Sequence, residues 1–261
     1  MVNKKICLFS SFSVNNHIDN YVKFYLESLK SHFNEVIMIT NNRDIIKSDL
    51  TFLNRIGVGV LRVENEGLDF GMWYKGLNEI EIDNYDQVAF INDSCILFDR
   101  NGLRHILDWV DKNDIEYCGL TDSNQIDYHI QSYFTIAKSS IFQYIKNYYS
   151  DNGIINDDSR NIIEVYEIGI SKYLIEKGVK IGSYFTHKDY TSPNISIMES
   201  VKLIKNGCPL IKKKLLRNSF RDHEKSFLEY HNFNFNTNYK SLIIDKIKNQ
   251  NINIEFLLEF R

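Results

Sequence analysis

Apolar and polar positions along the first part of the chain alternate in a way that predicts strands and helices in turn. Four short apolar runs, each leading into a polar loop, lie at residues 5–9, 35–40, 58–63 and 87–91. Three stretches with apolar side chains at helical spacing lie between them, at residues 17–33, 44–53 and 69–77. This order predicts an α/β fold with a mostly parallel sheet flanked by helices.

The polar loops that follow the apolar runs indicate where a ligand binds. In parallel sheets, ligands bind at the carboxyl ends of the strands. The loops expected at that edge are residues 10–13, 41–42, 65–71 and 92–94. We therefore expect a binding site built from these loops.

The second half of the chain has a less regular pattern. Strands are predicted at residues 117–120, 129–136 and 179–185, and helices at residues 139–149 and 167–177. Gly178 is expected to end the second of these helices. From residue 195 the chain becomes basic and helical, which predicts a main domain at residues 1–218 and a helical C-terminal appendage at residues 219–261.

Composition narrows the class of protein. With 43% hydrophobic residues, 25% charged residues and a net charge of −3, the chain is typical of a globular protein without a basic face for nucleic acid. The four cysteines are far apart and lack CxxC spacing, which favours buried free thiols. Because no apolar run approaches the roughly 18 residues of a membrane span, we expect a soluble, cytoplasmic protein.

Asn92, Asp93 and Ser94 form the clearest local motif, since a predicted strand delivers them at its carboxyl end. A carboxylate at this place can bind Mg²⁺ or Mn²⁺ through oxygen, with phosphate oxygens completing the shell. The structural alternative is an aspartate that caps the next turn. The triplet alone leaves both interpretations open.

A second motif surrounds Asp69, which lies between Gly67 and Gly71 just before a predicted helix. Glycines let the backbone approach a ligand closely, and the N–H groups at a helix start suit phosphate oxygens. Asp69 can accept hydrogen bonds from a ribose or sugar hydroxyl. The structural alternative is an N-capping aspartate with both glycines in a tight turn.

His129, Gln131 and Tyr133 share one face of the predicted strand 129–136, which suggests recognition of hydroxyl groups. A structural histidine is the alternative for His129. Glu167, expected at the start of a helix, fits either a first-turn acidic residue or a general base. His187, after a late strand, is a candidate metal or phosphate contact, although a lone exposed histidine is more often neither.

Together these motifs resemble the rhamnan synthesis F family of bacterial polysaccharide glycosyltransferases. The resemblance is carried by residues 65–73, 85–94, 119–121, 129–134 and 207–217. It implies a GT-A-like fold and an enzyme that moves a sugar, with dTDP-rhamnose as one donor, onto a surface polysaccharide or lipid-linked glycan such as rhamnan, O-antigen or capsule. It also suggests that Asn92-Asp93-Ser94 stands in place of a DxD triplet.

On this basis we assign the candidate site residues. Donor binding is assigned to Phe9, Ser10, Asn41, Asn65, Gly67, Asp69, Gly71, Asn92 and Ser94. Acceptor binding is assigned to His129, Gln131 and Tyr133. Asp93 and His187 are the expected ligands of Mn²⁺ or Mg²⁺, Glu167 is the preferred base, and Asp122 is its substitute.

Other functions stay open at this point. A non-catalytic nucleotide-sugar-binding module that scaffolds a polysaccharide synthase would carry the same binding residues. A nucleotidyltransferase is less favoured, because residues 10–16 contain no Lys or Arg. The basic run at residues 212–217 is either a solvated helix face or a contact with anionic lipid at the inner membrane or with a lipid-diphosphate acceptor.

Overall fold

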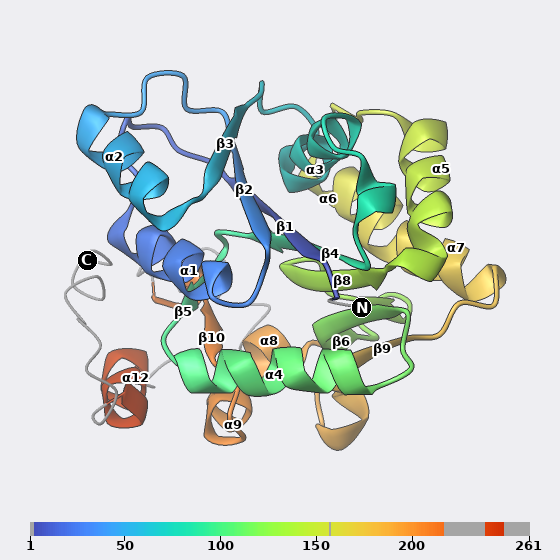
Figure 1. The fold of residues 1–261 in the computed structure, drawn as a ribbon. Helices are drawn as coiled ribbons and strands as arrows, with labels where there is room; N and C mark the ends of the chain where they lie inside the picture. The colour runs from blue at the N-terminus through green and yellow to red at the C-terminus, as the bar shows by residue number, and fades with distance from the viewer. Residues whose placement is uncertain (1–2, 157, 217–237, 248–261) are drawn as a thin grey trace.

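An eight-stranded sheet forms the centre of the structure, a computed structural model that describes residues 3–156, 158–216 and 238–247. Its strands are β1 (Lys5–Ser11), β2 (Glu35–Thr40), β3 (Gly59–Arg62), β4 (Gln87–Asn92), β6 (Tyr117–Ser123), β7 (His129–Ile130), β8 (Phe134–Lys138) and β9 (Ile181–Phe185). They are ordered β3-β2-β1-β4-β8-β6-β7, with β9 paired to β6 (Figure 1). β1 to β4 pair in parallel, as do β6 and β9, whereas β8 runs antiparallel to β4 and β6.

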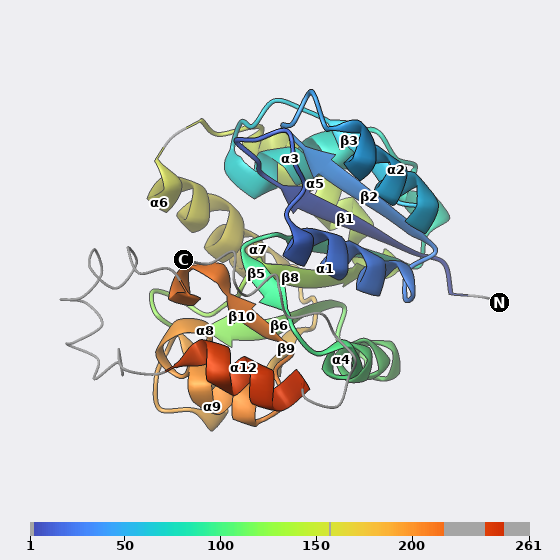
Figure 2. The same cartoon turned by 90° about the vertical axis from the view of Figure 1, so that its left-hand side faces the viewer.

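Helices cover both faces of this sheet (Figures 1 and 2). The helices of the described residues are α1 (Asn20–Lys30), α2 (Lys47–Ile56), α3 (Leu68–Asn78), α4 (Arg100–Lys112), α5 (Phe142–Asn152), α6 (Ser159–Ile162), α7 (Gly169–Glu176), α8 (Ile195–Met198), α9 (Ser200–Lys205) and α12 (Tyr239–Ile247). A π-helical segment, η3 (Ile163–Ile168), joins α6 to α7. Two short 3₁₀ turns, η4 (His187–Asp189) and η5 (Lys213–Leu216), follow β9 and precede the C-terminal part.

Alternation along β1 explains why the sheet is buried on both sides. Ile6 and Leu8 pack with α3 and α5 in one core cluster, while Cys7 and Phe9 pack with α1 and α4 in the other. All four side chains have no exposed surface. A strand covered on both faces must be apolar throughout, which is the pattern that the sequence shows. The predicted α/β class is therefore confirmed.

Helix α4 was not predicted, although its sequence carries the signals of a helix. The Asp99 side chain caps its start by accepting a hydrogen bond from the backbone N–H of Gly102 at 3.0 Å. Its buried side chains follow helical spacing: Leu103, Ile106, Leu107 and Val110. A capped amphipathic stretch of this kind is identifiable from sequence alone.

Two predictions for the second half are corrected by the structure. The predicted strand at residues 129–136 is divided into β7 and β8 by a turn at residues 131–133. Glu167 does not begin a helix, because the helical segment already starts at Ser159, where Asp158 caps the backbone of the following residues.

A small antiparallel pair outside the main sheet joins distant parts of the chain. It consists of β5 (Cys95–Leu97) and β10 (Leu210–Lys212), and its register sets Lys212 opposite Cys95. The backbone N–H of Lys213 then donates to the carbonyl oxygen of Ser94 at 2.8 Å. This pairing brings the basic run next to the Asn92-Asp93-Ser94 triplet.

The structure also bears on the predictions for the cysteines, for membrane-spanning helices and for the C-terminal appendage. All four cysteines are free and buried, as predicted. No helix in the described ranges is long and apolar enough to cross a membrane. The predicted boundary at residue 218 lies outside the described residues and stays a prediction. Of the expected appendage, α12 packs Tyr239 and Ile243 into the core cluster that also contains α9 residues.

Candidate active site

A cavity of about 310 Å³ opens where β4 and β6 end, beside the π-helical segment η3 and the turn η5. The antiparallel course of β8 contributes to it, because the turn before β8 meets the carboxyl end of β4: Ile91 pairs with Phe134. The charged and imidazole side chains that line the cavity are Asp69, His129, Glu167, Lys212 and Lys214. The predicted binding edge of the sheet therefore does contain a cavity with chemically active groups.

The corner around Asp69 joins three of the predicted loops. The register of β1 and β4 sets Ser10 beside Asn92. Ser10 Oγ donates to Asp69 Oδ1 at 2.6 Å, and Asn92 Nδ2 donates to Asp69 Oδ2 at 2.7 Å. Asn92 Oδ1 in turn accepts from Ser94 Oγ at 2.6 Å. Asp69, Asn92 and Ser94 all line the cavity, whereas Ser10 supports it from behind.

The surroundings of Asp69 alter its proton affinity. Burial raises its pKa to about 6, and the charge of Asp93 acts in the same direction. The hydrogen bonds from Ser10 and Asn92 oppose this rise, since they favour the ionised form. Asp69 is therefore a cavity carboxyl group that exchanges its proton close to neutral pH.

The local backbone geometry explains why glycines stand on both sides of Asp69. Gly67 and Leu68 adopt positive φ values of 69° and 54° at the start of α3, which turns Asp69 toward the cavity. A Cβ atom on Gly71 would lie 1.8 Å from the carbonyl oxygen of Glu66, so no other residue fits there. Neither glycine lines the cavity, and Asn65 is exposed outside it. Gly67 thus provides the tight turn of the alternative interpretation, but Asp69 does not cap the helix, since the N-cap is Gly67 and Asp69 accepts from Ser10 and Asn92 instead.

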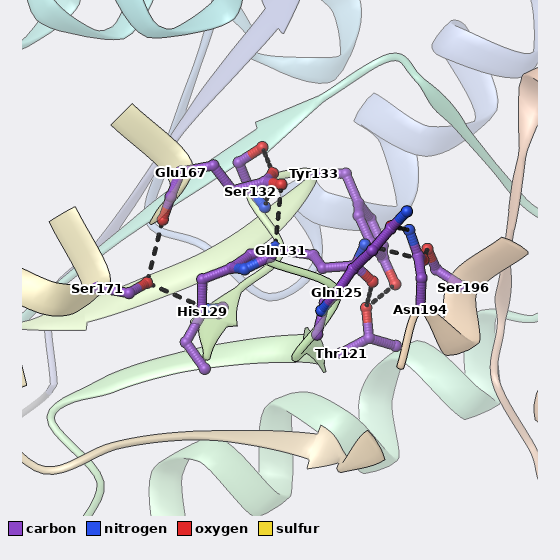
Figure 3. A network of polar contacts seen from close by, with 12 residues as sticks. Thr121, Gln125, His129, Gln131, Ser132, Tyr133, Glu167, Ser171, Asn194 and Ser196 are labelled. Atoms are coloured by element: carbon purple, nitrogen blue, oxygen red, sulfur yellow. Dashed lines mark hydrogen bonds and ion pairs between the residues drawn. The ribbon is translucent and has the colours of Figure 1, made fainter. Parts of the chain in front are cut away.

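A second corner is built around Glu167 (Figure 3). Glu167 Oε2 accepts hydrogen bonds from the backbone N–H of Ser132 at 2.7 Å and from Ser132 Oγ. Glu167 Oε1 lies 3.4 Å from His129 Nε2. His129 Nδ1 is 2.8 Å from the carbonyl oxygen of Asp127, which fixes the orientation of the ring.

Glu167 and His129 shift each other's pKa. Burial acts to raise the pKa of Glu167, but the hydrogen bond and charge of His129 outweigh it and hold that pKa below its ordinary value. Burial acts to lower the pKa of His129, but the hydrogen bond and charge of Glu167 outweigh it and raise that pKa. The two groups therefore form a charged pair in the cavity wall.

The wall next to this pair consists of neutral hydrogen-bonding groups (Figure 3). Gln131 Oε1 accepts from Thr121 Oγ1 at 2.7 Å, and Gln131 Nε2 donates to Asn194 Oδ1 at 3.3 Å. Tyr133 Oη lies 2.6 Å from Thr121 Oγ1. His129, Gln131 and Tyr133 all line the cavity, as predicted, but the turn at residues 131–133 brings them there rather than the alternation of one strand.

Asp93 points to the other side of the β4 end. Its Oδ2 accepts from Ser11 Oγ at 3.2 Å, and its Oδ1 lies 3.5 Å from Lys213 Nζ. Lys213 also donates to Tyr21 Oη at 2.6 Å. Burial raises the pKa of Asp93, and the charge of Lys213 opposes that rise. Asp93 does not line the cavity, whereas Asn92 and Ser94 on either side of it do.

Asp122 and His187 come together, but outside the cavity. Asp122 Oδ1 accepts from the backbone N–H of His187 at 2.5 Å and lies 2.9 Å from His187 Nδ1. Asp122 Oδ2 accepts from Thr186 Oγ1 at 3.0 Å. Both carboxylate oxygens thus hold the start of η4 against the end of β6. Neither residue lines the cavity.

Two further candidates are fixed by contacts of their own. Phe9 has no exposed surface and packs edge-on against the ring of Tyr25, with centroids 5.4 Å apart. The Asn41 side chain makes two hydrogen bonds of 3.0 Å to the backbone of Ser13, one as acceptor and one as donor. These contacts hold the loops after β1 and β2 together, and neither residue lines the cavity.

The residues present do not fit the divalent metal site that the resemblance implies. The two expected ligands belong to separate clusters: Asp93 is paired with Lys213, and His187 with Asp122. Within the part of the chain that the structure describes, no group of three or more His, Cys, Asp or Glu side chains could hold a metal ion. The expected pair therefore does not form a shared donor set.

Several lining residues were missed or misinterpreted from the sequence. Lys212 and Lys214 line the cavity, although their run was assigned to a solvated helix face or to contact with anionic lipid or a lipid-diphosphate acceptor. Arg217, at the end of that run, lies outside the described residues, and contact with the inner membrane stays a prediction. Asn194 was also missed, and its bridge to Ser123 depends on pairing between distant segments. The sequence indicates strand β10 only through the apolar pair Leu210-Ile211 just before Lys212.

Comparisons with known proteins extend the sequence resemblance. The family described as rhamnan synthesis protein F matches residues 36–261. Virulence protein VirA of Vibrio anguillarum is 27% identical over 259 residues, which cover 83% of this chain and 80% of VirA.

Solved structures give weaker similarities. The 4-diphosphocytidyl-2C-methyl-D-erythritol synthase of Anaerococcus prevotii has a TM-score of 0.47 at 9% identity, covering 70% of this chain and 89% of that one. A cytidylyltransferase of Leptospira borgpetersenii has a TM-score of 0.43 at 16% identity, covering 96% and 99% of the two chains. These values are too low to assign a function. The match over residues 36–261 shows that this chain belongs to the rhamnan synthesis protein F family.

Proposed function

We propose that this protein is a glycosyltransferase that moves a sugar from a nucleoside-diphosphate donor to a bacterial surface polysaccharide or a lipid-linked glycan. Rhamnose is the sugar we propose, because the family is described by rhamnan synthesis. The observation that carries the proposal is the cavity at the ends of β4 and β6, in which two carboxyl groups and two lysines meet a wall of hydroxyl-binding side chains. Such convergence of polar groups in one cavity is typical of a substrate site.

The cavity offers polar groups for both substrates. Asn92, Ser94 and the lysines offer hydrogen-bond donors and positive charge for the donor diphosphate. Gln131 and Asn194 offer an amide pair, which suits the hydroxyl groups of an acceptor sugar. Glu167 also lines the cavity, held in place by Ser132.

We propose Glu167 as the group that accepts the proton of the acceptor hydroxyl. A general base must lie within hydrogen-bond reach of the proton that it removes, and Glu167 is the carboxylate on the hydroxyl-binding wall. Its low pKa keeps it ionised across neutral pH. Asp122 is not proposed for this role, because both of its oxygens are engaged with residues 186 and 187 outside the cavity. No step is derived through Mn²⁺ or Mg²⁺.

The test is release of nucleoside diphosphate from a donor panel that includes dTDP-rhamnose and UDP-glucose, with the purified full chain. We expect release from at least one donor, faster when a suitable glycan acceptor is present, and a raised melting temperature with the same donor. A donor that raises the melting temperature without any release would instead support the non-catalytic scaffolding module. Absence of both effects across the panel would contradict the proposal.

A further inference from the structure

The ends of β4 and β10 lie side by side and alternate in the same way. Asn92 and Ser94 line the cavity, and Asp93 between them does not. Lys212 and Lys214 line the cavity as well, and Lys213 between them pairs with Asp93 on the other side. The pairing of β5 with β10 fixes this arrangement, because it sets residue 212 opposite residue 95. Two ammonium groups are thereby held next to the polar side chains of the triplet.

Lys212 is positioned by an aromatic ring rather than by a counter-ion. Its Nζ lies 3.8 Å from the centroid of the Tyr133 ring, a cation–π contact. The Tyr133 hydroxyl is anchored to Thr121, so the ring is a fixed platform. Among the described residues, no Asp or Glu oxygen lies within 4 Å of this ammonium group as an ion-pair partner. A positive charge held in this way can still bind an anion.

The charges that line the cavity favour an anionic ligand. Glu167 lies 3.4 Å from His129, whose raised pKa favours the imidazolium form that balances the carboxylate charge. The remaining charged lining groups are Asp69, Lys212 and Lys214, with Asp69 losing charge as pH falls toward 6. Protonation of Asp69 near pH 6 removes a negative charge from the lining, which favours an anionic ligand further.

We propose that the Lys212 and Lys214 ammonium groups, together with Asn92 and Ser94, bind the diphosphate of the donor directly and take the place of the divalent cation expected at this site. On the opposite side, Lys213 supplies the counter-ion of Asp93, the residue expected to hold that cation. This inference rests on the proposed function and deepens it, because it specifies how the charge of the departing nucleoside diphosphate is neutralised. The ammonium group of a lysine combines positive charge with three N–H donors, which suits phosphate oxygens.

The experiment is isothermal titration of the full chain with inorganic pyrophosphate and with dTDP, in buffer containing EDTA. We expect both to bind the wild-type protein, and Lys212→Met to weaken binding by at least about tenfold, as expected for loss of a charge-assisted contact. Lys212→Arg keeps the charge and is expected to retain most of the affinity. Lys205→Met, which removes an exposed lysine of α9, is the matched control and is expected to leave affinity unchanged.

The Asp93→Asn variant distinguishes neutralisation of the diphosphate by lysines from neutralisation by a divalent cation that Asp93 holds. Direct binding by lysines predicts that this variant binds dTDP within about twofold of wild type, and that Mn²⁺ does not restore Lys212→Met. The inference is overturned if dTDP binds only with Mn²⁺, if Asp93→Asn abolishes binding, or if Lys212→Met binds normally. Failure of the proposed function looks different: the binding pattern holds, but no nucleotide-sugar is turned over.

Discussion

The two corners of the cavity contain carboxyl groups that respond to burial in opposite ways. Asp69 is surrounded by neutral donors, Ser10 and Asn92, and burial raises its pKa to about 6. Glu167 is also desolvated, yet its pKa is lowered, because the imidazole of His129 supplies a hydrogen bond and positive charge. Neutral hydrogen bonds therefore do not offset the loss of water at Asp69, whereas a cationic partner does so at Glu167.

This difference assigns separate tasks to the two groups. A carboxylate that stays ionised at all working pH values is always ready to accept a proton from the acceptor hydroxyl. A carboxyl group that becomes neutral near pH 6 repels a neighbouring diphosphate less as the pH falls. Pairs of titratable groups with pKa values moved apart are typical of sites that need two roles from one residue type. The predictions below test this division.

The largest expected effect is on the transfer rate of Glu167→Gln. Loss of a general base typically lowers a rate by about 10²- to 10⁴-fold, and donor binding should remain, because Lys212 is held by the Tyr133 ring rather than by an ion pair with Glu167. The measurements are the release of nucleoside diphosphate at saturating donor and the dTDP affinity. Glu164→Gln is the matched control, since Glu164 is an exposed residue of the same segment. Full activity of Glu167→Gln would show that another group accepts the proton of the acceptor hydroxyl.

Asp69→Asn should change stability with pH rather than abolish turnover. The folded pKa of about 6 lies above the ordinary value of 3.8, so the contribution of Asp69 to stability is fully present below pH 3.8 and is lost as pH rises to about 6. Asparagine does not ionise, so the variant keeps its stability as the pH rises. Its free energy of unfolding should therefore increase by up to about 3 kcal/mol relative to wild type across that window. Urea unfolding at pH 4, 5, 6 and 7.5 measures the difference. A constant difference across the window would contradict the raised pKa.

The asymmetry between the two corners also explains what could be predicted from the sequence. Ser10 and the triplet at Asn92 lie at the ends of β1 and β4, where burial on two faces leaves continuous apolar runs, and the loop around Asp69 follows the partly exposed edge strand β3. Their convergence follows from the rule that parallel strands end at one edge. Local pattern was sufficient for this corner.

The lysine wall could not be predicted in the same way. Lys212 reaches the cavity because β10 pairs with β5, and no local pattern specifies a register between residues 95 and 212. The orientation of the Asp93 side chain could not be predicted for the same reason, because its partner Lys213 is brought into place by the pairing of β10 with β5. The alternation of a strand does separate residue 93 from residues 92 and 94, but only the structure shows which side is the cavity.

His129→Gln should make Glu167 behave more like Asp69. Without the imidazolium, burial is opposed only by Ser132 and the charge of Lys212, and the pKa of Glu167 should rise. The expected result is an acid limb of the transfer rate that moves to higher pH, with activity at pH 8 largely kept. The control is His32→Gln, a histidine in the turn after α1 that does not line the cavity. An unchanged acid limb would mean that His129 does not set the proton affinity of Glu167.

The smallest expected effect concerns the neutral donors in the Asp69 corner. Ser10→Ala removes the 2.6 Å hydrogen bond to Asp69 Oδ1, which favours the ionised form. The pKa of Asp69 should therefore rise further, by up to about one unit, since one hydrogen bond contributes about 0.5–1.5 kcal/mol. A carboxyl-detected NMR titration of Asp69 measures this shift directly. Ser132→Ala removes the hydrogen bond that Ser132 Oγ donates to Glu167, keeps the one from the backbone N–H, and should leave the Asp69 titration in place. Equal shifts of Asp69 in both variants would show that the two corners titrate as one unit, and the division of roles between them would fail.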